Sequence, residues 1–194
     1  MRVMARPQEF DTDEALRQAM RVFWSKGFEA TSMADLLEAT GLSKSSLYGA
    51  FGSKRDLFLA AFDAYREARA KDMGRILRQG PARDAIEHFF RTIITDARDG
   101  NSEGCMSINQ AVELAPRDPD IGSRVRADFE RMENALARII QRGQQEGSIK
   151  SRGNPAAIAR ILVLAFPGFQ VMVRAGCEKS RLDEGLTALL TILD

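Results

Sequence analysis

The spacing of apolar positions predicts a chain built from helices. In the segment 12–26, apolar residues recur at intervals of three and four, which is the period of one helix face. These positions are Ala15, Leu16, Ala19, Met20 and Phe23. Similar spacing returns along the rest of the chain, and we find no convincing alternation of apolar and polar residues of the kind typical of a half-buried strand. The pattern predicts an all-α fold.

Start and stop signals divide this pattern into about nine helices. Asp11, Ser32 and Ser53 each stand three positions before an acidic residue, which is the arrangement of a capping box at a helix start. Gly27 and Gly41 are placed to end the first two helices. The expected helices cover about 12–26, 33–40, 43–49, 54–77, 82–98, 105–115, 121–146, 155–175 and 181–193.

The stretch TSMADLLEATGLSKSSLYGAF, residues 31–51, predicts a helix-turn-helix. Leu36, Leu42 and Leu47 fall on an inward face, and Gly41 supplies the positive φ that the turn requires. The second helix carries serines and a tyrosine where an exposed helix favours Ala, Glu or Lys. In this motif the second helix enters the major groove of DNA. The alternative is a plain helical hairpin with a serine-rich surface.

Charge narrows the possible partners. The chain holds 28 Lys and Arg against 27 Asp and Glu, so its formal net charge is +1. Non-specific DNA binding needs many cations, which argues against an architectural DNA-binding protein. Positive and negative residues are nevertheless unevenly distributed, because residues 43–54 contain two lysines and no acid. This is a local basic patch on the predicted second helix, and a weak signal in itself.

The sequence lacks the signals of metal-binding proteins, enzymes, secreted proteins and membrane proteins. One histidine, His88, and two cysteines give neither zinc-ligand spacing nor a disulfide framework, so we expect no metal and no cofactor. The chain has no paired carboxylates at useful spacing and no phosphate-cradling glycine loop, so we expect no enzyme. Its start has no apolar signal segment, and the apolar run 161–173 is too short to span a bilayer. We expect a cytoplasmic protein with no membrane partner.

The N-terminal segment, residues 12–59, resembles the DNA-binding domain of the TetR family of transcriptional regulators. The matching positions are Phe23, Gly27, Phe28, Thr31, Ser32, Gly41, Ser43, Leu47, Tyr48, Phe51, Lys54 and Leu57. The resemblance implies an all-helical homodimer. It also implies a DNA-binding domain over residues 1–58 and a ligand-binding and dimerisation domain over residues 59–194.

The resemblance also implies DNA contacts at particular positions. It assigns phosphate contacts to Thr31, Ser32 and Lys54, and groove contacts to Lys44, Ser46 and Tyr48 with Ser43 and Ser45 beside them.

The same stretch departs from the family pattern at one place. Many relatives follow the tyrosine with another aromatic residue or a histidine, whereas Gly49 and Ala50 follow it here. Direct readout of bases then rests on fewer large side chains. For Tyr48 the alternative is that its ring stacks on the helix bundle. We also infer a basic arm, Arg2 and Arg6, that adds contacts to the backbone or minor groove.

In the second domain, the stretch GCMSINQAVELAPRDPDI resembles the NemR-like subgroup, in which a reactive cysteine stands at the position of Cys105. A thiol at a helix start has a lowered pKa. The alternative is that Cys105 packs as a small apolar residue. Phenylalanines and methionines on inward faces suit an apolar ligand, although they also suit an ordinary core. The candidate ligand-binding or sensing residues are Cys105, Met106, Asn109, Phe129, Met132, Phe166 and Gln170.

The last two helices carry more apolar residues than one core absorbs. These are Ile158, Ile161, Leu162, Leu164, Ala165, Leu186, Leu189, Leu190 and Leu193. The resemblance implies that they form a four-helix dimer interface, and the symmetry of a dimer predicts a near-palindromic double-stranded operator. Two hypotheses for release stay open. Either a small apolar inducer releases a repressor from DNA, or an electrophile or oxidant does so by modifying Cys105.

Overall fold

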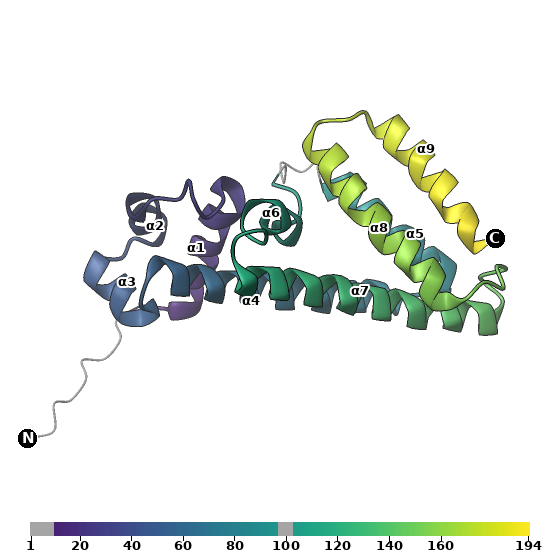
Figure 1. Ribbon diagram of the computed structural model, residues 1–194, viewed down its shortest axis with the longest axis horizontal. Helices are drawn as coiled ribbons and strands as arrows, with labels where there is room; N and C mark the ends of the chain where they lie inside the picture. Colours follow the sequence, from purple (N-terminus) through teal and green to yellow (C-terminus); the bar gives the residue numbers. More distant parts are fainter. Residues whose placement is uncertain (1–9, 97–102) are drawn as a thin grey trace, which may run out of the picture. The chain divides into compact units, whose positions relative to one another are not determined.

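A computed structural model describes residues 10–96 and 103–194 (Figure 1). Within these ranges the chain forms nine α-helices, one short 3-10 helix and no strand, which confirms the all-α prediction. The helices are α1 (Thr12–Lys26), α2 (Met33–Thr40), α3 (Lys44–Phe51), α4 (Lys54–Ile76), α5 (Ala82–Asp96), α6 (Met106–Glu113), α7 (Pro119–Glu146), α8 (Pro155–Arg174) and α9 (Lys179–Leu190), with the 3-10 turn at Thr191–Leu193.

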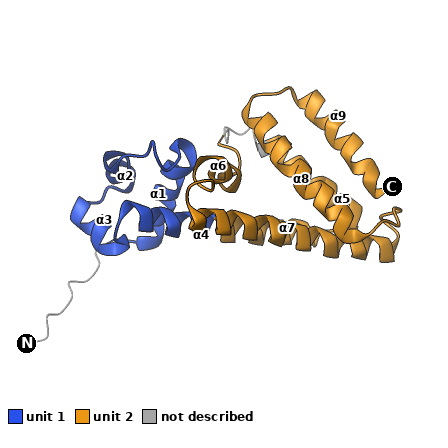
Figure 2. Ribbon diagram, viewed as in Figure 1, with its two compact units in different colours: residues 1–65 blue, residues 66–194 orange. Residues whose placement is uncertain are grey.

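The chain divides into two compact units, Met1–Tyr65 and Arg66–Asp194 (Figure 2). The division falls inside α4, further along the chain than the expected border between residues 58 and 59. The reason is local packing, because Ala61, Phe62 and Tyr65 of α4 are buried in the first unit. One continuous helix therefore contributes to both units.

Capping chemistry explains where the first helices start. The Ser32 side chain accepts the N–H of Asp35, and the Asp35 carboxylate accepts the N–H of Ser32, which completes the predicted box. Ser53 and Asp56 exchange the same pair of bonds at the start of α4. At α1 the box is incomplete. Asp11 caps the helix, but the Glu14 carboxylate binds Arg17 and Gln18 instead of reaching back.

α3 and α7 both extend beyond their expected limits. α3 continues past residue 49 to Phe51, because Gly49 keeps helical backbone geometry and the stop comes from Gly52 at φ 85°. α7 begins at Pro119 because Asp118 accepts the N–H groups of Asp120 and Ile121. Proline suits the first helical turn, where its missing N–H has no partner to lose.

Aromatic rings from α1 and α4 hold the first unit together. Phe23 and Phe58 meet edge to face with their centroids 5.2 Å apart, and Phe58 stacks on Phe62 at 5.9 Å. Leu36 of α2 and Leu47 of α3 are buried in the same unit, at 0% and 3% exposure. Such burial is worth roughly 2 kcal/mol for each large side chain. It fixes the angle between the two helices of the motif.

The second unit comprises the end of α4 and the helices α5 to α9, which pack around one apolar cluster. Phe89 of α5 stacks on Phe166 of α8 with their centroids 5.9 Å apart, and Phe90 meets Phe169 edge to face at 5.8 Å. α8 packs against α7 near the C-terminal end of α7 and crosses it at an angle (Figure 1). These contacts confirm inward positions for Phe89, Phe90 and Phe166.

α8 corrects the expectation about membrane-spanning length. Its 20 residues make it long and apolar enough to cross a bilayer by length and composition, since the helix extends beyond the run 161–173 on both sides. Its inner face is nevertheless part of the core, where Ile158, Leu162 and Phe166 are buried. A core helix of a globular protein has the same composition, so α8 is weak evidence for a membrane.

Candidate nucleic-acid interface

The turn between α2 and α3 has the geometry of a helix-turn-helix. Gly41 adopts the left-handed conformation, with φ 64° and ψ 10°, and its N–H donates to the Leu37 carbonyl to close α2. Ser43 then caps α3 by accepting the N–H of Ser46 at 3.1 Å. Since Leu36 and Leu47 are buried beneath the turn, the opposite face of α3 is left outside.

That outer face presents Lys44, Ser45, Tyr48 and Gly49, all of them exposed. The Lys44 ammonium lies 5.8 Å from the centroid of the Tyr48 ring, within the range of a cation–π contact. Tyr48 is 39% exposed. This exposure argues against the alternative that its ring stacks on the helix bundle. A cation and a phenol thus stand one helical turn apart on the face that the motif turns to DNA.

The serines at the start of α3 form a connected hydroxyl cluster. The Ser43 hydroxyl lies 3.0 Å from that of Ser45 and 2.9 Å from that of Ser46. The Ser43 oxygen is already used as the helix cap, so the exposed Ser45 is better placed to meet an external phosphate or base. No acidic side chain lies in the first turn of α3. The positive end of the helix dipole therefore faces outward without a local counter-charge.

Lys54, at the start of α4, is tied to its own protein. Its ammonium donates to the Phe28 carbonyl at 2.7 Å and lies 4.4 Å from the centroid of the Phe28 ring. An ammonium has three donors, so this bond leaves the group able to meet a phosphate as well. The contact orders both the side chain and the loop between α1 and α2. Phe28 is thus a supporting residue that spacing alone did not indicate.

Thr31 requires a correction. The residue is only 1% exposed, and its hydroxyl donates to the Gly27 carbonyl at 2.6 Å. The side chain therefore closes the loop that joins α1 to α2, and its proton is not directed to a phosphate. Ser32 is exposed, but its hydroxyl donates to Asp35 at 2.8 Å. A phosphate contact from Ser32 requires that this bond be exchanged.

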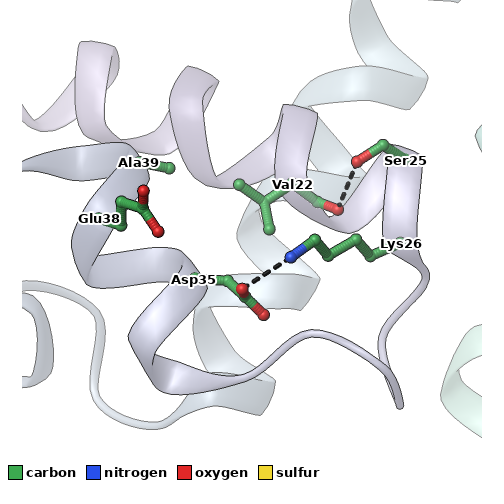
Figure 3. A pocket seen from close by; sticks show the side chains of 6 residues that line it. All are labelled: Val22, Ser25, Lys26, Asp35, Glu38 and Ala39. Carbon is green, nitrogen blue, oxygen red and sulfur yellow. Dashed lines mark hydrogen bonds and ion pairs between the residues drawn. The ribbon is translucent and has the colours of Figure 1, made fainter.

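The Asp35 carboxylate beside this start is neutralised locally. Lys26 donates to it at 2.7 Å, and together with the backbone and hydroxyl of Ser32 it lowers the pKa of Asp35 to about 2. This ion pair crosses a shallow hollow of about 280 Å³ between α1 and α2 (Figure 3). The hollow is lined by Val22, Ser25, Lys26, Asp35, Glu38 and Ala39, none of which belongs to the predicted ligand residues.

In the second unit, the predicted ligand residues gather around α6 and the apolar cluster. Cys105 is half-buried at the position before α6, packs against the cluster, and makes no side-chain capping bond. Met106 is fully buried. Phe129 and Met132 of α7 are partly buried against the cluster. The Asn109 side chain donates to the Glu103 carbonyl at 2.9 Å, so it first of all holds the start of α6.

Gln170 is a polar residue buried on α8, as its place inside an apolar run suggested. The residue is 8% exposed, and no hydrogen bond of its side chain occurs within the described ranges. Its amide oxygen lies 3.9 Å from the position that a Cβ on Gly104 would take, so it faces the segment before α6. Arg174, one turn further along α8, donates to the Glu103 carbonyl at 3.2 Å. Glu103 and Arg174 were missed because they lie outside any apolar run.

Gln110 was also missed. It is fully buried, its amide nitrogen donates to Glu113 at 3.1 Å, and its amide oxygen has no partner among the described residues. The signal was present, because a glutamine interrupts the apolar positions of α6. Across residues 10–96 and 103–194 no group of three His, Cys, Asp or Glu is placed to hold a metal ion. The predicted arm of Arg2 and Arg6 lies outside the described residues.

Comparison with known proteins agrees with this geometry. Residues 15–61 match the family described as "Bacterial regulatory proteins, tetR family", and residues 80–189 match "Tetracyclin repressor-like, C-terminal domain". The uncharacterized HTH-type transcriptional regulator YezE of Bacillus subtilis is 31% identical over 98% of this chain and 100% of its own length. The transcriptional repressor ComR of Escherichia coli is 31% identical over 91% of this chain and 86% of its own length.

Solved structures give the same answer. The TetR family regulator CifR, in a cysteine mutant bound to a 26-base-pair double-strand operator DNA, superposes with a TM-score of 0.85 at 26% identity, covering 98% of this chain and 100% of CifR. The reduced form of Escherichia coli NemR has the same fold, with a TM-score of 0.85 at 19% identity, covering 94% of this chain and 96% of NemR. These relatives are transcriptional regulators and not enzymes, as predicted. The chain is a DNA-binding transcriptional regulator of the TetR family.

Proposed function

We propose that the protein is a repressor that binds a near-palindromic operator as a homodimer and leaves it when a small apolar ligand binds. The observation that carries the DNA part is the outer face of α3, where Lys44, Ser45 and Tyr48 are exposed around a helix start without acidic residues. Lysine neutralises phosphate or bonds guanine, and hydroxyls bond bases or phosphates. The name of ComR, a repressor, supports the repressor role.

A second copy of the chain is the proposed partner of α8 and α9. Ile161, Leu164 and Val171 are 46%, 73% and 56% exposed and lie on one face of α8. Monomeric proteins rarely leave such a contiguous apolar face in water. A Cβ added to Gly168 on α8 or to Gly185 on α9 would meet nothing within 4 Å, which leaves room for another helix to approach closely.

The predicted list for this interface is too broad. Ile158, Leu162, Leu186, Leu190 and Leu193 are each at most 5% exposed and belong to the core of the protomer. Their spacing could not distinguish the two faces of helices that are apolar on both. The proposed interface is therefore narrower than the predicted one.

A test of the interface is Leu164→Asp, with Val112→Asp as the matched control. Val112 is 78% exposed on α6, which is not one of the proposed interface helices. We expect the Leu164 variant to sediment as a monomer and to lose operator binding, and the Val112 variant to remain a dimer. A dimeric Leu164→Asp protein contradicts this assignment.

For the ligand, we propose the region bounded by the Phe89–Phe166 stack, Met132, Phe129 and Gln170. The rings and the thioether provide an apolar surface, and the Gln170 amide provides one polar anchor. Ligand sites typically combine an apolar lining with a few polar groups of this kind. Release requires only that the ligand bind one dimer state better than the other.

A physical connection from this region to α4 supports the release mechanism. Arg66 of α4 donates to Asp128 of α7 at 2.9 Å, and the Ser107 hydroxyl of α6 donates to the same carboxylate at 2.8 Å. The side chains of Arg66 and Asp128 are only 11% and 16% exposed. Because a partly buried charge does not readily lose its partner, a shift of α6 or α7 is transmitted to α4. α4 continues to Lys54 in the first unit.

The second candidate is release by modification of Cys105. Its half-buried side chain lies directly before α6 and packs against the apolar cluster of the second unit. CifR, whose operator complexes contain cysteine substitutions, makes a thiol trigger worth testing in this chain. Release by a thiol-reactive electrophile in wild type but not in Cys105→Ser supports this candidate. Equal release in both proteins rules it out.

We place the regulator in the cytoplasm, where operator DNA is accessible, with no role in a membrane. The main test is binding of the purified protein to the DNA upstream of its own gene. We expect tight binding that weakens with salt and falls in Lys44→Ala. Unchanged affinity in Lys44→Ala contradicts the role given to α3.

A further inference from the structure

Glycine inside a helix has a cost that usually has a visible reason. It is the least favourable helix residue after proline, because its backbone loses the most freedom on folding. Gly143 of α7 shows such a reason, since a Cβ there would lie 2.5 Å from the Cδ1 atom of Ile149. Gly41 and Gly52, which follow the last residues of α2 and α3, have a different reason, since both adopt positive φ.

Gly49 has neither reason. It lies within α3, its φ is not positive, and a Cβ added to it would meet nothing within 4 Å. The residue is exposed, so it makes no room for a packed neighbour. Alanine at this position fits the protein itself without strain and favours the helix more. Nothing within its own unit therefore explains why this helix position has glycine, which lowers helix stability relative to alanine.

The position of Gly49 shows where an external reason lies. It follows Ser45 by one helical turn and is adjacent to exposed Tyr48, so it belongs to the outer face of α3. A helix in the major groove has its backbone close to the groove walls when its side chains are small. Glycine is the residue that permits the closest approach of another backbone.

We propose that operator DNA approaches the α3 backbone so closely at Gly49 that no side chain fits there. Gly49 then sets the depth to which α3 enters the groove, and with it which base edges Lys44, Ser45 and Tyr48 reach. This assignment makes Gly49 a specificity-determining position that acts by the absence of a side chain. It rests on the proposed role of α3 as the groove-reading helix.

The test exploits opposite signs of two effects. Gly49→Ala and Gly49→Leu should both raise the melting temperature, by about 2 °C, because both residues favour a helix. Operator affinity should fall in the same proteins, by about tenfold for Ala and about a hundredfold for Leu, as expected for overfilling a close contact. Circular dichroism melting and fluorescence anisotropy with operator DNA measure the two effects in the full chain.

Gly74→Ala is the matched control. Gly74 lies in α4, and a Cβ there would meet only the flexible guanidinium of Arg78, at 3.7 and 4.0 Å. It should raise the melting temperature in the same way and leave operator affinity unchanged. Weakening that increases from Ala to Leu supports a steric contact. Equal weakening by both indicates a need for helix flexibility and overturns the proposal.

Unchanged affinity in Gly49→Leu also overturns it. The parallel variant Lys44→Ala separates this failure from failure of the proposed function. If Lys44→Ala weakens binding while Gly49→Leu does not, α3 still reads DNA, and only the close approach is wrong. If neither variant weakens binding, the role of α3 itself is wrong.

Discussion

The two compact units differ in how directly their surfaces reveal a partner. In the first unit, residues that the core does not need form one short face on α3, and the shape of the motif already specifies DNA. In the second unit, the polar exceptions Gln110 and Gln170 are buried within an apolar core. Gln110 already donates to Glu113, and the ligand that we propose for Gln170 has a shape that the chain does not encode locally. An exposed interface is therefore easier to assign than an internal one.

The largest expected effect is a loss of stability in the second unit. Asp128→Ala removes the carboxylate that the partly buried Arg66 guanidinium and the Ser107 hydroxyl both bind, which should lower the free energy of unfolding by about 3 kcal/mol. Urea unfolding followed by circular dichroism measures the change. The control is Arg75→Ala, which removes the exposed pair with Asp72 and should cost less than about 1 kcal/mol. Similar losses of unfolding free energy in both variants contradict a major stabilising role for the pair Arg66 and Asp128.

The next effect is a loss of operator affinity in the first unit that leaves the stability of that unit unchanged. Tyr48→Ala should weaken operator binding by about 1–3 kcal/mol if the ring reaches bases. Because Tyr48 is exposed, the melting temperature should change little. Anisotropy titration and thermal melting of the same samples separate the two quantities. A stability loss comparable to that of a buried aromatic residue would indicate that Tyr48 supports the bundle after all.

A smaller effect tests the correction at Thr31. Thr31→Val keeps the shape of the side chain but removes the donor to the Gly27 carbonyl, so it should destabilise the first unit by about 1 kcal/mol. The operator affinity of the folded protein should stay the same, because the hydroxyl faces inward. Ser32→Ala is the comparison, since Ser32 is exposed. A clear loss of affinity in Thr31→Val restores the predicted phosphate contact.

The smallest effect is a pH dependence. The pKa of Asp35 is lowered from 3.8 to about 2 by Lys26 and Ser32, so the folded state favours the charged carboxylate. Its contribution to stability should be complete above pH 3.8 and disappear as the pH falls through 2. Melting of wild type and Asp35→Asn across this range should show a difference that vanishes at the acid end. A constant difference contradicts the ion-paired cap.

The sequence predicted the fold well because its signals are local. The Ser32 and Asp35 box, the left-handed Gly41 and the proline at the start of α7 each involve residues a few positions apart. Local geometry dictates such pairs before any tertiary contact forms. The failed half-box at Glu14 shows the limit, because Arg17 competed for the same carboxylate.

The candidate sites were only partly predictable, because they depend on tertiary neighbours. The bond from Thr31 to the Gly27 carbonyl and the bond from Lys54 to the Phe28 carbonyl appear only when the loop between α1 and α2 folds back. Ile158 and Ile161 are equally apolar, yet one is 5% and the other 46% exposed. Spacing defines two faces of a helix and does not say which of them the core takes.

The central claim is that two copies of α3 read two halves of one operator. Its most direct test is footprinting and affinity measurement of the full-length protein on the DNA upstream of its own gene, with each half-site scrambled in turn. We expect two protected half-sites about one helical turn apart or somewhat more, and a large loss of affinity when either is scrambled. Equal binding to intact and scrambled DNA would contradict it.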